Sequence, residues 1–302
     1  MAPVVVLAGG TGGAKLARGM YDLVGEDLVV IANTGDDVEI YEGYVSPDPD
    51  LVTFWLADLI DERGWGMRGD TFHVMDGLRT LGEEVWFNLG DRDLALCLRR
   101  ARRLREGAPL TDVLAEHAAA LGVRARVLPM SDAPVRTRVF ARGRWVPLQE
   151  FLILERGEGP VDGVEFEGVS AAAPPAAVLE AIAAARAIVI GPSNPVISIR
   201  PILDVPGLAG ALQTSPAPVV AVSPVVGGEV LKGPTAPFMD WAGQSVDAAG
   251  VAGAYAPLLD GIVADEPVDG LPALVADILM RDADARRRVA EDVLRFAEEL
   301  RG

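Results

Sequence analysis

The hydrophobic pattern along the chain alternates between two kinds of segment. Short continuous apolar runs predict buried strands at residues 4–8, 28–32, 85–87, 126–128, 187–190 and 219–222, with a last strand at 261–264. Stretches with apolar residues at helical spacing predict helices at 14–24, 51–60, 94–105, 110–121 and 176–186, and a helical tail over 271–300 that is broken near Arg281. Strands that alternate with helices predict a mostly parallel sheet with right-handed crossovers.

The periodicity changes near residue 133. Residues 135–154 alternate apolar and polar positions around Arg142-Gly143-Arg144, which is typical of a β-hairpin, and residues 161–169 predict another strand. We therefore expect a Rossmann-like α/β fold, a mostly parallel sheet flanked by helices. Its nucleotide-binding core would comprise residues 1–132 and 171–302, with a small β-rich insertion at 133–170.

Three acidic segments that contain or adjoin glycine or proline are the main candidates for chemistry: 33–37 (Asn-Thr-Gly-Asp-Asp), 46–50 (Ser-Pro-Asp-Pro-Asp) and 88–93 (Asn-Leu-Gly-Asp-Arg-Asp). The first and third directly follow predicted strands, and open α/β sheets hold ligands at strand ends. Clustered carboxylates indicate a hard divalent cation such as Mg²⁺, which shares its coordination with water and substrate phosphates. The segments favour an enzyme that handles phosphates.

A glycine-rich segment, Gly9-Gly10-Thr11-Gly12-Gly13, follows the first predicted strand. It does not match the phosphate loop of nucleoside triphosphatases. Glycines allow close approach of the backbone to a phosphate, and the free N–H groups of the following helix favour negative charge. The alternative is a tight turn without a ligand.

The aspartates also have purely structural interpretations. Asp50 could cap a helix that begins at Leu51, and Asp48 between two prolines could close a turn. Four carboxylates within 15 residues would nevertheless repel one another unless a cation lay between them. We therefore expect some of Asp36, Asp37, Asp48 and Asp50 to bind a metal ion.

Two further polar segments leave two interpretations open. Asp91 or Asp93 could cap the helix from Leu94, or both could hold Arg92 as a planar clamp for phosphate or carboxylate. The loop 191–195 (Gly-Pro-Ser-Asn-Pro) follows a predicted strand, and its prolines would fix a hydroxyl and an amide that suit a base or a ribose.

Composition excludes several classes of function. The net charge of −17 argues against nucleic acid as a partner. No apolar run reaches the roughly 18 residues of a membrane span, and no basic region precedes the first apolar run, so we expect a cytoplasmic protein. The single cysteine, Cys97, excludes an intrachain disulfide. The histidines, His73 and His117, belong to no evident Ser-His-Asp set, which disfavours nucleophilic acyl chemistry.

Taken together, the motifs resemble one family, the 2-phospho-L-lactate transferases of coenzyme F420 biosynthesis and their phosphoenolpyruvate-transferring bacterial relatives. The resemblance covers nearly the whole chain. It rests on 9–12 with Lys15-Leu16, 33–37, 46–50, Trp65-Gly66, 70–72, 90–93, 128–132, 191–195, Pro201-Ile202 and 221–224.

The resemblance implies a reaction and a set of site residues. The donor would be a guanosine diphosphate-linked three-carbon acid, the acceptor the deazaflavin Fo, the released product GMP, the cofactor Mg²⁺ and the assembly a homodimer. The implied residues are Asp50, Asp37 and Arg92 for catalysis; Asp50, Asn88 and Trp65 for Fo; Gly9, Gly10, Thr11, Gly12, Lys15, Ser193 and Asn194 for the donor nucleotide; and Asp36, Asp37 and Asp50 for the metal. Asp50 is the residue implied to orient or deprotonate the attacking hydroxyl.

The chain departs from the family pattern at several positions, namely Pro49, Leu96-Cys97, Ala133 and Arg200. These changes leave open which three-carbon acid is transferred. Two rival functions also remain. A related group of nucleotide-sugar-binding regulators shares the glycine-rich start but has a Gly/Ser-rich run after its paired aspartates. A nicotinamide-dependent dehydrogenase would need an acidic residue about 20 positions after the glycines.

Overall fold

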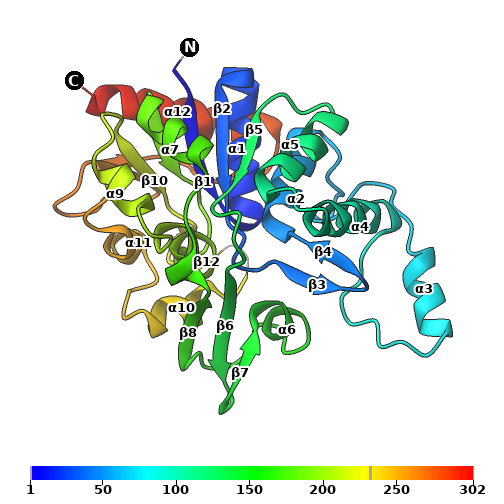
Figure 1. Ribbon diagram of the computed structural model, residues 1–302. Coiled ribbons are helices and arrows are strands. Elements are labelled where there is room, and N and C mark those ends of the chain that lie inside the picture. Colours follow the sequence, from blue (N-terminus) through cyan, green and yellow to red (C-terminus); the bar gives the residue numbers. More distant parts are fainter. Residues whose placement is uncertain (1, 231–232, 302) are drawn as a thin grey trace.

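The computed structural model describes residues 2–230 and 233–301 and centres on a seven-stranded sheet (Figure 1). The strand order is β14-β13-β10-β9-β1-β2-β5, and every neighbouring pair is parallel. The strands are β1 (Val4–Ala8), β2 (Leu28–Ala32), β5 (Arg126–Pro129), β9 (Ala187–Ile190), β10 (Val219–Val222), β13 (Gly261–Ala264) and β14 (Ala273–Val275). This confirms the predicted α/β fold class.

Helices cover both faces of the sheet, which explains the continuous apolar runs of its strands. Alternate residues of β1 contact opposite layers: Val4 and Val6 belong to one core, and Val5 and Leu7 belong to the other. The first core is covered by α1 (Gly10–Val24), α2 (Pro47–Leu56), α5 (Leu110–Ala120) and α12 (Ala283–Leu300). The second is covered by α7 (Ala176–Ala184), α8 (Arg200–Leu203), α9 (Leu208–Gln213) and α11 (Ala248–Tyr255).

The predicted insertion 133–170 contains an antiparallel sheet with the order β7-β6-β8. Its elements are β6 (Arg136–Ala141), β7 (Arg144–Pro147), α6 (Leu148–Ile153) and β8 (Gly163–Glu167). Phe151 of α6 packs edge-on against Phe238 of α10 (Thr235–Trp241), with ring centroids 5.9 Å apart. The insertion therefore shares a small core with the main fold.

The remaining elements are hairpins, helices and turns outside the main sheet, and one of them, the turn Gly25–Asp27, lies directly before β2 at the amino ends of the strands. They are the hairpins β3 (Val38–Ile40) with β4 (Gly43–Val45) and β11 (Val225–Val226) with β12 (Glu229–Val230), the helices α3 (His73–Thr80) and α4 (Asp91–Arg105), the 3₁₀ turns Gly25–Asp27 and Val169–Ala171, and the π-helical turn η3 (Pro195–Ile199). Figure 1 shows α3 projecting from the body of the molecule beyond α4. Within the described ranges, no helix is both long and apolar enough to cross a bilayer.

Several predicted element boundaries were wrong. Residues 85–87 form no strand, because Val85 and Phe87 pack into a small satellite core beside α3 and α4 instead of pairing with the sheet. The tail is not helical from Leu271: the edge strand β14 follows β13, and helix begins only at Ala283. Two helices also begin earlier than predicted, α1 at Gly10 instead of residue 14 and α2 at Pro47 instead of residue 51.

Candidate functional site

The chain adds strands on one side of β1 first, beginning with β2, and later on the other side, beginning with β9. The crevice beyond the carboxyl ends of β1 and β9 is thus the topological switch point of the sheet. A cavity of about 780 Å³ opens there. It is lined by all the residues predicted for the donor nucleotide, namely Gly9, Gly10, Thr11, Gly12, Lys15, Ser193 and Asn194.

The glycines at the start of α1 permit close packing of two loops. A Cβ on Gly12 would lie 1.9 Å from the Pro192 carbonyl oxygen, and a Cβ on Gly13 would lie 2.6 Å from Ser193 Oγ. Gly10 has a φ of +63°, which favours glycine. The N-cap residue, Gly9, has no side chain, and the amide of Gly10 donates to the Asp48 carboxylate of α2. Gly9, Gly10, Thr11 and Gly12 line the cavity, so the remaining amides at the start of α1 provide partial positive charge there.

Replacement of Gly12 by alanine is expected to lower stability by about 1–3 kcal/mol, because the new methyl group must displace the loop at Pro192. Donor binding should weaken as well, since that loop lines the cavity. Thermal unfolding and GDP titration measure the two effects. Gly210→Ala on α9 is the matched control, because a Cβ there meets nothing within 4 Å. Equal melting temperatures for the two variants would contradict the packing argument.

Ser193 and Asn194 are held by hydrogen bonds to the backbone. Asn194 Oδ1 accepts from Val196 N (2.9 Å) and Ile197 N (3.2 Å), so it caps η3. Ser193 Oγ accepts from Gly9 N at 3.3 Å, which joins the β9 loop to the start of α1. The amide Nδ2 of Asn194 lies 3.4 Å from Thr235 Oγ1. The loop is therefore ordered by its own polar groups.

The described residues that line the cavity include three cations, Lys15, Arg156 and Arg281, and no carboxylate. Lys15 Nζ donates to Met280 O at 3.3 Å and lies 5.9 Å from the centre of the Trp55 ring. In a chain with 44 acidic residues, a cavity lined in this way is suited to an anionic ligand.

An acidic cluster adjoins this cavity and is joined to it by Asp48. Asp48 accepts from Gly10 N, the first residue of α1, and from Asn33 Nδ2 at 2.9 Å. Asn33 Nδ2 also donates to Asp36. Burial raises the pKa of Asp48 to about 6. Burial and the nearby Asp48 charge raise the pKa of Asp36.

Asp37 belongs to the same cluster and has one oxygen without a protein partner. Its Oδ1 accepts from Ser46 Oγ at 2.8 Å, whereas its buried Oδ2 has no hydrogen-bond partner within the described chain. Burial raises the pKa of Asp37 to about 7, against the effect of the Arg136 charge. Asp36 and Asp37 line a hollow of about 260 Å³ toward β6.

Asp36 and Asp48 can offer hard oxygen ligands to a divalent cation, because both carboxylates accept from the same Asn33 amide nitrogen and so lie close together. The ligand atoms of Asp36, Asp37 and Asp48 do not all lie within 4.8 Å of one another, so Asp37 would have to move to share the cation. Burial raises the pKa values of all three carboxyl groups. Asp48 was one of the four carboxylates considered for a metal ion, but it was not among the three that the family resemblance implied. Its position between two prolines did not indicate that its side chain is buried.

Mg²⁺ is expected to stabilise the protein more at about pH 8 than at about pH 5, because the carboxyl groups must lose their protons to bind it. Between the ordinary pKa of 3.8 and about 7, folded Asp37 binds more protons than unfolded Asp37. The metal-free protein should therefore lose stability as pH rises through this window. Melting temperatures with Mg²⁺ and with chelator measure both effects. An equal Mg²⁺ shift at both pH values would contradict the expectation.

Asp50 is bound by a fully buried arginine. Arg100 of α4 donates to both carboxylate oxygens of Asp50, with Nη1 3.0 Å from Oδ2, and also donates to Tyr44 O at 2.8 Å. Burial alone would lower the pKa of Arg100, but the Asp50 charge raises it overall. Asp50 lies in the first turn of α2, whose N-cap is Ser46, so the alternative in which Asp50 caps a helix that begins at Leu51 is wrong.

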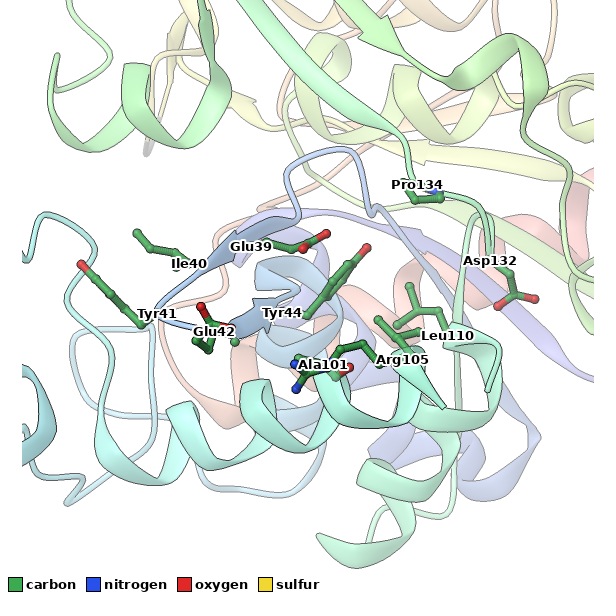
Figure 2. A pocket seen from close by; sticks show the side chains of 12 residues that line it. Glu39, Ile40, Tyr41, Glu42, Tyr44, Ala101, Arg105, Leu110, Asp132 and Pro134 are labelled. Atoms are coloured by element: carbon green, nitrogen blue, oxygen red, sulfur yellow. Dashed lines mark hydrogen bonds between the residues drawn. The ribbon is translucent and has the colours of Figure 1, made fainter. Parts of the chain in front are cut away.

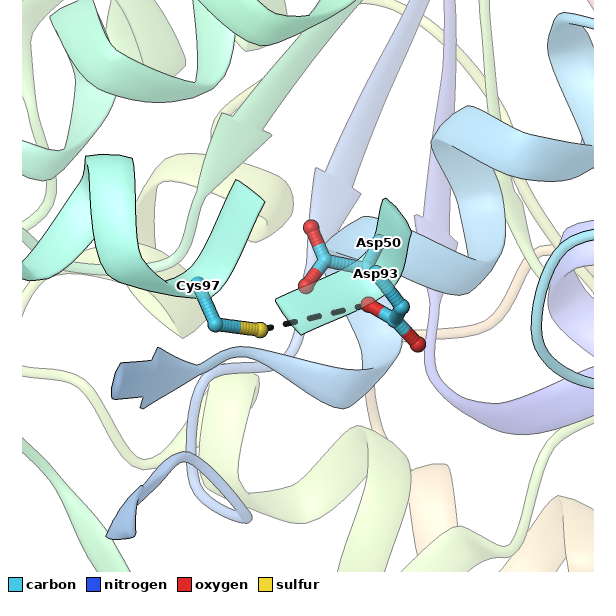
Figure 3. Close-up of side chains that lie close together, drawn as sticks. All are labelled: Asp50, Asp93 and Cys97. Atoms are coloured by element: carbon cyan, nitrogen blue, oxygen red, sulfur yellow. Dashed lines mark hydrogen bonds between the residues drawn. The ribbon is translucent and has the colours of Figure 1, made fainter. Parts of the chain in front are cut away.

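Asp93 and Cys97 lie beside this ion pair (Figure 3). Ligand atoms of Asp50, Asp93 and Cys97 lie within 4.8 Å of one another. Burial raises the pKa of the Cys97 thiol, and burial together with the Asp50 charge raises the pKa of Asp93 to about 7. A protonated thiol does not suit Mg²⁺, and the cation already present here is Arg100. The ligand atoms of this group lie closer together than those of Asp36, Asp37 and Asp48, but their chemistry suits Mg²⁺ less well.

Among the hydrogen bonds of the described residues, none joins the Arg92 side chain to Asp91 or Asp93, and its role as a clamp stays a prediction. Asp91 instead accepts from Thr71 Oγ1 (2.6 Å) and Val74 N (3.0 Å) at the start of α3. Asp70 accepts from Arg92 N and Asp93 N at the start of α4. The carboxylates cap each other's helices, and the exposed Arg92 side chain makes a 3.5 Å contact with Arg68 O.

The residues predicted for Fo are not gathered around one cavity. Trp65 is 52% exposed, and the Arg63 guanidinium lies 4.9 Å from its ring centre. Asn88 is exposed, and its Oδ1 accepts from Arg79 Nη2 at 2.8 Å. Their role stays a prediction. A separate hollow of about 510 Å³, shown in Figure 2, lies between the β3–β4 hairpin and α4 and contains none of the predicted site residues.

The fold and the site define a Rossmann-like α/β protein with an anion-binding cavity at the switch point and a carboxylate cluster beside it. Residues 4–284 match the family model described as 2-phospho-L-lactate transferase CofD. The 2-phospho-L-lactate transferase of Methanosarcina mazei is 38% identical, covering 96% of this chain and 99% of the relative. The phosphoenolpyruvate transferase of Streptomyces griseus is also 38% identical, covering 99% of both. The chain therefore belongs to the CofD family and is a transferase.

Solved structures show the same fold at lower sequence identity. The crystal structure of protein BH3568 from Bacillus halodurans superposes with a TM-score of 0.64 at 21% identity, covering 97% of this chain and 99% of that one. This likeness extends over the whole architecture.

Proposed function

We propose that this transferase acts in coenzyme F420 biosynthesis and moves a phospho-three-carbon-acid group from a guanosine diphosphate-linked donor to Fo, with Mg²⁺ as cofactor. A ribityl hydroxyl oxygen of Fo would form the new bond to phosphorus. The bond from phosphorus to the GMP oxygen would break, and the hydroxyl proton would leave to a base. The observation that carries the proposal is the carboxylate-free cavity with its three cations, directly joined to the acidic cluster through Asp48 and Gly10.

Phosphoryl-type transfer depends mainly on positioning and on neutralising charge. In the proposal the start of α1 and Lys15 bind the diphosphate, and the β9 loop with Ser193 and Asn194 binds the guanosine. Asp36, Asp37 and Asp48 would hold Mg²⁺, which supplies charge neutralisation at the phosphates. Asp50 remains the candidate base. Burial raises the pKa of Asp50, and the pairing with Arg100 opposes that rise. A role as a metal ligand would require exchange of that partner.

The experiment is to incubate the purified protein with Fo, Mg²⁺ and the guanylylated forms of phospholactate, phosphoenolpyruvate and phosphoglycerate, and to measure GMP release. GMP should appear with one acid preferred and only while Fo is present. No release with any acid would reject the transfer. Calorimetry with GDP and UDP distinguishes the transferase from the rival function, because equal binding of both nucleotides would favour a nucleotide-sugar-binding regulator.

Asn88→Ala is expected to weaken Fo binding several-fold while leaving GDP binding nearly unchanged, because Asn88 lies outside the donor cavity. Fluorescence titration with Fo and calorimetry with GDP measure the two affinities. Thr80→Ala, a neighbouring exposed position, is the control. If both affinities fell together, or neither fell, the acceptor would bind elsewhere.

Further parts of the proposal are a homodimer and a cytoplasmic location.

A further inference from the structure

The three cations of the donor cavity come from different parts of the fold. Lys15 belongs to α1, Arg281 precedes α12, and Arg156 follows α6 in the β-rich insertion. Arg156 is thus the cation that the insertion contributes to a cavity otherwise built largely by the main fold. No motif in the sequence pointed to it.

The backbone of Arg156 adopts a conformation that glycine prefers. Its φ is +58°, in the left-handed region that costs a non-glycine residue on the order of 1 kcal/mol. The turn that imposes this conformation is fixed by Gly157 N, which donates to the carbonyl of the buried Phe151 at 2.8 Å, and by Glu155 N, which donates to Glu150 O at 3.2 Å. Such strain at a cavity favours a functional role for the side chain.

The neighbouring carboxylate does not neutralise Arg156. Glu155 pairs with Arg144, and its other oxygen lies 3.9 Å from Arg142 Nη1. Among the residues that the structure describes, the Arg156 side chain makes neither a hydrogen bond nor an ion pair. It is therefore an exposed guanidinium in a cavity without carboxylates, in a chain of net charge −17.

We propose that Arg156 binds the diphosphate of the donor, an inference that rests on the proposed function. A guanidinium presents paired N–H groups that match two phosphate oxygens. Together with Lys15 and the start of α1 it surrounds the anion with positive groups from the core and from the insertion. The insertion thereby becomes a part of the donor site.

The test compares Arg156→Gly with Arg142→Gly. Arg142 lies in the same insertion, has a φ of +51° and does not line the cavity, so the two substitutions remove the same charge at the same backbone conformation. Neither variant should lower the melting temperature much, because glycine tolerates this conformation. The Kd for GDP should rise at least about tenfold in Arg156→Gly and stay within about twofold in Arg142→Gly. Arg156→Lys should recover part of the affinity.

Unchanged GDP affinity in Arg156→Gly overturns the inference. If GDP affinity is unchanged but the KM for the complete donor rises, the side chain binds the three-carbon carboxylate instead, which also overturns it. A wild-type protein that binds no GDP rejects the proposed donor. In that case inorganic pyrophosphate tests Arg156 separately: weaker binding by Arg156→Gly alone supports the inference, and equal binding by all three proteins, or binding by none, overturns it.

Discussion

Replacing Arg100 with alanine is expected to lower the free energy of unfolding by about 3–5 kcal/mol, because it leaves the buried carboxylate of Asp50 without its partner. Asp93 lies within the same group and would lose the compensating charge as well. For a chain of this size the melting temperature should fall by on the order of 10 °C. Thermal and denaturant unfolding measure the change.

Two further variants distinguish the loss of the ion pair from the general effect of a substitution on α4. Arg102→Ala is the matched control on α4, because Arg102 is 66% exposed and lies 3.7 Å from Glu106. It should cost under about 1 kcal/mol. The double variant Asp50→Asn/Arg100→Met removes both charges and should be more stable than Arg100→Ala. Equal stability of Arg100→Ala and Arg102→Ala would disprove the buried pair.

The second large effect concerns activity. Asp48→Asn is expected to lower kcat by at least about 100-fold, because a metal-bound carboxylate supports several kcal/mol of charge stabilisation in the transition state. The asparagine oxygen can still accept from Gly10 N, but its amide nitrogen cannot accept from Asn33 Nδ2, whereas the repulsion with Asp36 disappears. Because these two effects oppose each other, stability without metal should change little. Initial rates of GMP release and melting temperatures with and without Mg²⁺ provide the measurements.

Asp58→Asn is the control for this variant, because Asp58 lies just beyond α2 and its side chain is 69% exposed. Its rate should stay within about twofold of the wild type. Full activity in Asp48→Asn would show that Asp48 is not a metal ligand needed for the reaction. The same conclusion would follow if Mg²⁺ raised the melting temperature of this variant as much as that of the wild type. A comparable loss in Asp50→Asn would come with lower stability, since Arg100 would lose its charged partner.

The hydrophobic pattern was sufficient to predict six of the seven sheet strands. A parallel strand is buried on both faces and therefore appears as a continuous apolar run, as in Leu28–Ala32. The same pattern misled at residues 85–87, because a short apolar run has the same composition whether it pairs with a sheet or packs in a satellite core. The strand Ala273–Val275 was missed, since it is short and only partly buried.

The cavity at the switch point could be predicted from local sequence, because glycine loops at the ends of neighbouring parallel strands must meet at one edge of the sheet. The interactions of the charged residues could not be predicted in this way. Carboxylates with similar neighbours along the chain differ in their partners: Asp91 caps a helix, Asp50 pairs with an arginine, and Asp37 has one oxygen without a partner in the described chain. Their partners lie on other elements, as with Arg100, 50 positions from Asp50. Local pattern thus decides which segments become strands and loops, whereas only packing decides which charges are compensated, because compensation depends on distances in space that the order of residues does not contain.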